Sequence, residues 1–169
     1  MSLPSMGDWF FCNPLALIYY LNIASSFFYD TMKACIQPGV LLKIILYIDE
    51  VCPGNPLRPE KSRTLQSIYW AFLEWPQWLL QRTGAWFIFG TLRSTFVAKF
   101  PGEVAFLMSR ILDAFFPDLG CSFSRGLNLT HNGDSTYMTA TLHGFLADEK
   151  ALNQIGDCKG ASGLTNRNI

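Results

Sequence analysis

The sequence predicts an α/β fold, in which a mixed β-sheet is joined to an amphipathic helix and preceded by an N-terminal helical extension. Two apolar runs support the sheet, residues 44–50 and residues 141–149, because each ends in an Asp-Glu pair. Apolar runs of this length, rich in β-branched and aromatic side chains, are typical of buried strands. Open α/β sheets carry their chemistry at the carboxyl ends of strands, so two acid-ended strands indicate one shared site.

The composition describes a packed, intracellular chain of one domain. Its 169 residues fit a single domain, and 50% of them are hydrophobic against 15% that are charged, which excludes a disordered chain. The formal net charge is +0 at pH 7, so the chain as a whole lacks the basic surface that holds nucleic acid or anionic membranes. The five cysteines are odd in number and form no Cys-x-x-Cys pair, so we expect a reducing compartment.

Residues 1–40 form the predicted N-terminal helical segment, which packs on the core. Asn13 followed by Pro14 is a favourable helix start, with an N-cap side chain and a proline at the first helical position. A membrane-spanning helix over residues 9–28 is the competing interpretation, because this stretch is apolar and long enough. Asn22 interrupts it and no basic residue precedes it, so we favour two helices packed on the core and no membrane.

Three predicted strands and a helix follow. The strands are residues 44–48, residues 65–72 and residues 85–92, each rich in aromatic or β-branched side chains. A loop dense in proline and glycine separates the first two strands. Apolar side chains then recur at spacings of three and four from Phe100 to Phe115, which predicts an amphipathic helix.

The last predicted strands, residues 126–130 and residues 136–146, flank the dipeptide Asn132-Gly133. This dipeptide is favoured in two-residue hairpin turns. His131, beside the turn, is expected to be exposed to solvent, and the second strand delivers Asp148 just beyond its end.

Three strands, a helix and a final acid-ended strand follow one another in the ribonuclease-H-like fold. In that fold the first and fourth strands lie side by side and run parallel, which would bring Asp49 and Asp148 together. We therefore expect residues 41–156 to form an incomplete ribonuclease-H-like core and residues 157–169 to form a polar C-terminal tail.

Two blocks of the sequence resemble the catalytic blocks of DDE-type transposases of the Kyakuja-Dileera-Zisupton and CACTA-like kind. The first block comprises residues 46–50, Asn55-Pro56-Leu57, Lys61 and the aromatic run at residues 68–70. The second block comprises residues 145–149 with Gly156, Cys158 and Gly160. Over a longer span, residues 13–163 resemble a multicopy transposon-like family of protist genomes.

This resemblance implies a two-metal site that cuts and rejoins DNA in the nucleus. Asp49 and Asp148 would share Mg²⁺ or Mn²⁺, with Glu50 and Glu149 as further ligands. The residues implied to contact DNA phosphates are Arg58, Lys61 and Arg63.

The sequence ends before the Cys-x-x-Cys element and the third acid of such transposases, so we expect a truncated copy that does not cleave DNA by itself. DNA binding should be weak and salt-dependent. A non-catalytic module that docks another protein chain through its apolar N-terminal helices is the alternative, and a membrane-associated protein built on residues 9–28 is a further one. The aromatic side chains between Trp70 and Phe87 are interpreted as core, because basic residues do not accompany them as they would in a base-stacking surface.

Overall fold

A mixed four-stranded sheet forms the centre of the computed structural model, which describes residues 2–3, 7–53 and 63–147. The strands of this sheet are β3 (Leu42–Val51), β4 (Leu65–Phe72), β5 (Phe87–Arg93) and β8 (Ala140–Leu146). Their order across the sheet is β5-β4-β3-β8. The chain therefore has the α/β architecture with a mixed sheet that the sequence predicted.

The first acid-ended strand pairs with the last one, as predicted. β3 and β8 run parallel, with Leu42 opposite Ala140 and Tyr47 opposite Leu146, while β4 is antiparallel to both β3 and β5. β3 is thus an inner strand of the sheet. Its side chains alternate between a fully buried face, which includes Ile44 and Leu46, and a more accessible face.

The predicted order of three strands, one helix and one strand is corrected by the structure. The order across the sheet is β5-β4-β3-β8, which differs from the order of the strands along the chain. Additional elements also interrupt the chain: helix α3 (Gln77–Leu80), the 3₁₀ helix η2 (Thr83–Ala85), helix α4 (Ser94–Val97) and a hairpin of β6 (Leu127–His131) and β7 (Asp134–Met138).

The predicted strand at residues 136–146 is in fact two strands in different sheets. β7 pairs only with β6 in the hairpin, whereas β8 pairs with β3. The break falls at Thr139, whose carbonyl accepts a hydrogen bond from the amide of Leu42 at 2.9 Å. The apolar run continues across this point, so hydropathy alone does not mark the change of partner.

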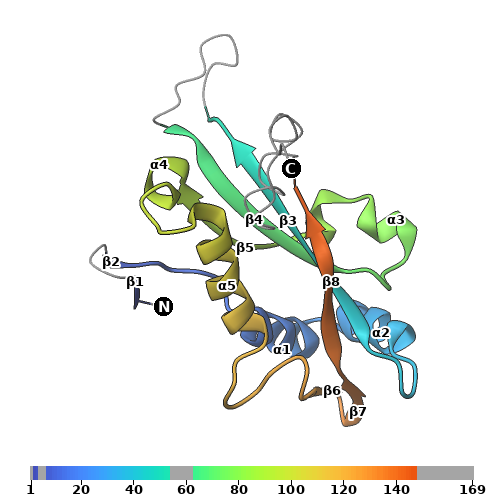
Figure 1. The fold of residues 1–169 in the computed structure, drawn as a ribbon. Helices are drawn as coiled ribbons and strands as arrows, with labels where there is room; N and C mark the ends of the chain where they lie inside the picture. The colour runs from blue at the N-terminus through green and yellow to red at the C-terminus, as the bar shows by residue number, and fades with distance from the viewer. Residues whose placement is uncertain (1, 4–6, 54–62, 148–169) are drawn as a thin grey trace, which may run out of the picture.

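Helix α5 (Glu103–Phe115) covers the buried face of the sheet. Its apolar side chains, at the predicted spacing of three and four, are buried: Val104, Leu107, Met108, Ile111 and Phe115. The ring of Phe115 meets that of Trp70 in β4 edge to face, with centroids 5.1 Å apart. Figure 1 shows α5 on one side of the sheet and α3 on the other. The four-residue α3 leaves much of the second face accessible.

The N-terminal segment forms the predicted pair of helices, α1 (Pro14–Ala24) and α2 (Ser26–Cys35). The Asn13 side chain accepts hydrogen bonds from the amides of Leu15 and Ala16, as an N-cap does. Both helices contact β6 of the hairpin, so they gather at one end of the sheet (Figure 1). Two short strands that the sequence did not indicate, β1 (Ser2–Leu3) and β2 (Gly7–Asp8), precede them.

No helix in residues 2–3, 7–53 and 63–147 is long and apolar enough to cross a membrane. The apolar stretch at residues 9–28 is divided by Ser25, which ends α1 and caps α2 through a hydrogen bond from the amide of Phe28.

Candidate functional site

The first acidic pair lies within strand β3 rather than beyond its end. Asp49 pairs with Ser67 and Glu50 pairs with Gln66 in the antiparallel ladder. Because neighbouring side chains of a strand point to opposite faces, the two acids face different sides of the sheet. The structure accordingly separates them into two cavities.

The first cavity, which we call the Asp49 cavity, lies on the face of the sheet away from α5. It has a volume of about 430 Å³ and is lined by Tyr47, Asp49, Tyr69, Thr83, Trp86 and Leu146. Four elements contribute to it: β3, β4, β8 and the 3₁₀ helix η2 with the residue that follows it. The carboxylate of Asp49 is exposed, so a ligand that enters this cavity has access to it.

Aromatic rings form most of the wall of the Asp49 cavity. Tyr47 and Tyr69 are directly opposite one another in the ladder, and their rings lie 6.0 Å apart with an angle of 26° between their planes. Trp86 meets Tyr47 edge to face, at 6.1 Å and 69°. The indole N–H of Trp86 donates to the carbonyl of Leu80 at 3.1 Å, which fixes the orientation of this ring. These rings are partly buried, and Trp86 packs against the hydrophobic core, in agreement with its interpretation as a core residue.

The second cavity, which we call the Glu50 cavity, lies on the face that α5 covers. Its volume is about 400 Å³, and its lining includes Glu50, Gln66, Ser94 and Glu103. Glu103 begins α5 with φ of 44°, a left-handed conformation that is uncommon for residues other than glycine. Sequence analysis did not single out Glu103, because one acid at a helix start is an ordinary feature that stabilises the helix dipole.

Most of the other predicted site residues fall outside the described part of the chain. Asp148, Glu149, Arg58 and Lys61 belong to this group. Arg63 is described, and it is exposed just before β4. The structure therefore shows the positions of Asp49, Glu50 and Arg63. The roles predicted for the other four residues stay predictions.

The register of the parallel pair nevertheless relates the two acidic pairs. Tyr47 lies opposite Leu146, and this is the last paired position of β8. Asp49 follows Tyr47 by two residues, and Asp148 follows Leu146 by two residues. The number of residues in the sequence between this matched position and the aspartate is thus the same in both segments.

The donor chemistry of the β3 end fits a hard cation. Carboxylate oxygens, which Mg²⁺ and Mn²⁺ prefer, are supplied by Asp49 in one cavity and by Glu50 and Glu103 in the other. Within residues 2–3, 7–53 and 63–147, no group of three or more His, Cys, Asp or Glu side chains is arranged to hold a metal ion.

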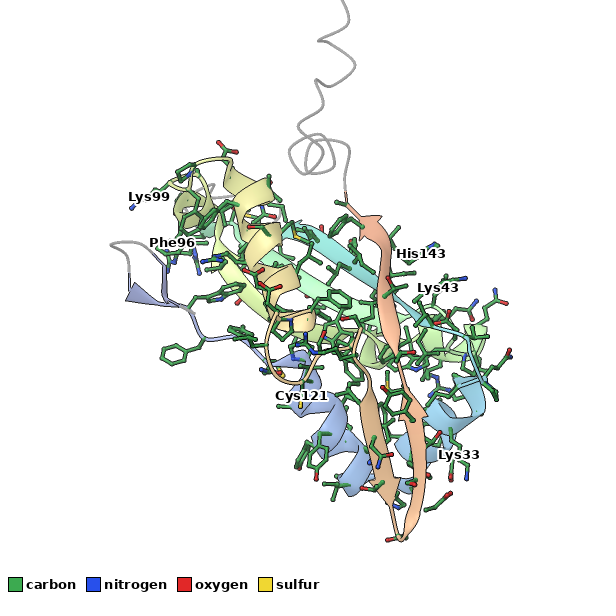
Figure 2. The ribbon with its side chains drawn as sticks, turned by 60° about the horizontal axis from the view of Figure 1, so that its bottom comes forward. Lys33, Lys43, Phe96, Lys99, Cys121 and His143 are labelled. Atoms are coloured by element: carbon green, nitrogen blue, oxygen red, sulfur yellow. The ribbon has the colours of Figure 1, made fainter. Side chains whose placement is uncertain are left out.

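Two basic side chains lie along the same side of the sheet as the Asp49 cavity but do not line it. Figure 2 shows Lys43 of β3 and His143 of β8 on the side away from α5. A second charged feature lies on the hairpin, where Lys33 of α2 pairs with Asp134 of β7. A hydrogen bond from Lys33 lowers the pKa of the Asp134 carboxyl, and the same bond raises the pKa of Lys33. These pKa shifts arise from an ion pair that joins α2 to β7, and they do not involve the acids of β3.

Comparison of the chain with protein-family models, with curated proteins and with solved structures finds no match.

Proposed function

We propose that this chain derives from a DDE-type transposase with a ribonuclease-H-like fold, and that its acidic strand ends bind a divalent metal ion. One observation carries the proposal: the acid-ended strand β3 pairs in parallel with β8, in a sheet of order β5-β4-β3-β8. The sequence pattern alone predicts this adjacency of the first and last strands. A chance similarity between two short blocks would not require the two strands to be neighbours.

The matched register supports Asp49 and Asp148 as the shared ligands. Each aspartate is two residues beyond a position at which β3 and β8 are paired, Tyr47 with Leu146. If β8 continues in register, the two carboxylates lie side by side on the face of the Asp49 cavity. Glu50 and Glu149 would then share the opposite face with Glu103.

Mg²⁺ or Mn²⁺ bound there would supply the positive charge that phosphoryl transfer on DNA requires. The chain's own contribution is to orient carboxylate oxygens toward one point and to contact phosphates through Arg58, Lys61 and Arg63. We propose that the chain does not cut DNA alone, because in-line displacement needs two fixed ions and an aligned nucleophile. An intracellular, nuclear location belongs to the same proposal.

A metal titration of the thermal stability tests this proposal. Metal that binds only the folded state stabilises it, by about 1.4 kcal/mol at a free concentration tenfold above Kd. We expect Mg²⁺ and Mn²⁺ to raise the Tm of the wild-type chain, and Asp49→Asn to abolish the rise. Glu103→Gln is the matched control, since it removes an acid from the opposite face of the sheet. A rise that disappears in Glu103→Gln but persists in Asp49→Asn would assign the metal to the Glu50 cavity and refute the Asp49 site.

Incubation of the full chain with plasmid and Mn²⁺ tests the proposed lack of activity. We expect supercoiled plasmid to remain intact, with weak binding that falls steeply as salt increases. Nicking that is lost in Asp49→Asn would instead establish the chain as an active nuclease.

A second candidate function is a protein-interaction module, and the outer surface of the N-terminal helices favours it. Helix α1 has no charged residue, and four large side chains on α1 and α2 have exposed fractions between 54% and 67%: Tyr19, Tyr20, Ile23 and Phe27. Large exposed side chains gathered on two successive helices are candidates for a surface that another chain covers.

Sedimentation velocity distinguishes this candidate. If the surface joins two copies, the wild-type chain sediments as a dimer and the double variant Tyr20→Ser, Ile23→Ser as a monomer. A wild-type monomer at all concentrations would exclude self-association through this surface.

A further inference from the structure

The Asp49 cavity has the features of a site for an organic cation. Three aromatic rings line it, and among the described residues of its wall Asp49 carries the only charge. The faces of aromatic rings are electron-rich and attract cations, most strongly where water is excluded. We propose that the Asp49 cavity binds a methylated ammonium group, with its methyl groups against the rings of Tyr47, Tyr69 and Trp86 and its charge balanced by the Asp49 carboxylate.

The three rings that line the cavity differ in orientation. Tyr47 and Tyr69 are nearly parallel, at 26°, whereas Trp86 stands at 69° to Tyr47, so the rings border the cavity in more than one plane. The strand pairing fixes the backbones of both tyrosines, and the hydrogen bond to Leu80 fixes the indole. The walls are therefore in place before a ligand arrives, which reduces the entropy lost on binding.

The volume and the polar groups of the cavity favour a small organic cation over other ligands. A volume of about 430 Å³ is within the range of small-molecule pockets. A nucleotide would bring its phosphates toward the Asp49 carboxylate, which repels them. A methylated ammonium group loses little hydration on binding and buries its methyl surface against the aromatic rings. This inference does not rest on the proposed function, although both use Asp49.

Two probes with the same shape test the inference on the wild-type chain. Choline and 3,3-dimethylbutan-1-ol differ in one atom, the charged nitrogen, which is carbon in the alcohol. Calorimetric titration in EDTA removes any contribution of metal ions. We expect choline to bind at least about tenfold more tightly than the alcohol. Equal affinities, or no binding of choline, would overturn the proposal.

Variants of the cavity assign the binding to its residues. We expect Tyr69→Leu to weaken choline binding about tenfold, and Tyr69→Phe, which keeps the ring, to change it less than about twofold. Asp49→Asn, at an exposed position, should fold normally and also weaken binding. If Tyr69→Leu does not fold, the affinity of Asp49→Asn for choline still tests the site. Unchanged affinity in Asp49→Asn and Tyr69→Leu would place the bound choline elsewhere and refute the site.

Two further probes separate related ligands. Choline and a trimethyllysine peptide carry the same head group, so once choline binds, the tighter of the two identifies a small molecule or a protein tail as the source. Adenosine that binds as tightly as choline would mean that the rings stack on bases, which contradicts the cation assignment. Because these titrations contain EDTA, a failure of the metal proposal leaves their outcome unchanged.

Discussion

The two ends of the central sheet are built differently. At the closed end, defined by Leu42, Phe72 and Ala140, side chains are at most 1% exposed. Helices α1 and α2 and the β6–β7 hairpin gather there (Figure 1). At the acidic end, defined by Asp49 and Glu50, both carboxylates are exposed and each borders a cavity.

This difference separates stability from function within one sheet. The closed end contains the packed aromatic and hydrogen-bonded groups that hold the fold, so substitutions there should unfold the chain. At the acidic end the carboxylates of Asp49 and Glu50 are exposed. Substitutions of these two residues should therefore change ligand binding and leave the free energy of unfolding nearly unchanged. Charged side chains at an accessible strand end are more consistent with a role in ligand binding than with a role in packing the core.

The largest effect is expected at the closed end, from Phe72→Ala. Phe72 is fully buried, and its ring contacts Trp70, Trp75 and Phe123 at centroid distances of 5.6, 5.6 and 6.1 Å. Loss of this ring leaves a cavity, so the free energy of unfolding should fall by about 3–5 kcal/mol. Chemical denaturation measures it. Phe72→Leu is the control and should cost much less, because it retains most of the apolar volume.

Asn22→Ala should have the next largest effect. Asn22 is fully buried in α1, and its side-chain amide donates to the carbonyl of Thr130 in β6 at 2.6 Å. The substitution removes this hydrogen bond, so the free energy of unfolding should fall by about 1.5 kcal/mol. Hydrogen exchange should report faster opening of the hairpin than of β3. Equal acceleration in both would show that α1 and the hairpin are not a separate unit of stability.

Removal of the helix cap should have a smaller effect. Asn13→Ala loses the acceptor for the amides of Leu15 and Ala16, which should cost about 1 kcal/mol of stability. Thermal denaturation measures this loss. Asn13→Ser keeps a capping oxygen and should remain close to the wild type. An equal loss in both variants would contradict the capping role.

The ion pair between Lys33 and Asp134 should give a small, pH-dependent contribution. Hydrogen bonding to Lys33 lowers the pKa of Asp134, so the stabilisation is present above the ordinary pKa of an aspartate and is lost as the pH falls through the lowered value. The pKa of Lys33 is raised, so the stabilisation is also lost as the pH rises through that raised value. Both side chains are about half exposed, at 49% and 53%, so salt should weaken the pair.

NMR titration of the Asp134 carboxyl checks this sign. Its pKa should lie below that of a free aspartate in the wild type and return upward in Lys33→Met. A pKa that does not respond to Lys33→Met would exclude the ion pair in solution.

The smallest effect on stability is expected at the acidic end. Asp49→Asn and Glu50→Gln change exposed side chains, so each should shift the free energy of unfolding by less than about 0.5 kcal/mol. Chemical denaturation in EDTA is the measurement. A loss as large as that of Asn22→Ala would mean that these acids stabilise the fold, and the contrast between the two ends would disappear.

Periodicity predicted the main elements because each has one dominant hydrophobic pattern. Residues 65–72, rich in aromatic side chains, form β4 with the predicted bounds, and the Asn13-Pro14 start gives α1. The division at Thr139 was missed, since one apolar run serves two sheets and only tertiary contacts determine where it changes partner.

The candidate site was predictable only in part, for a similar reason. The acidic pair of β3 is visible in the sequence, but its separation into two cavities depends on what covers each face of the sheet. Glu103 and Trp86 reach these cavities from segments far along the chain. His131, expected in solvent, instead bonds through Nδ1 with the carbonyl of Asn22 at 2.8 Å and stacks on Tyr29, because α1 and α2 cover the hairpin.

The proposed metal site requires that the ends of β3 and β8 bind one divalent cation together. Paramagnetic broadening by trace Mn²⁺ tests this shared binding most directly, because broadening depends on distance from the ion. We expect the amide signals of Asp49 and Leu146 to broaden together, Lys33 to be unaffected, and Asp49→Asn to abolish the effect. Broadening at only one of the two strands, or broadening that survives Asp49→Asn, would contradict the shared site.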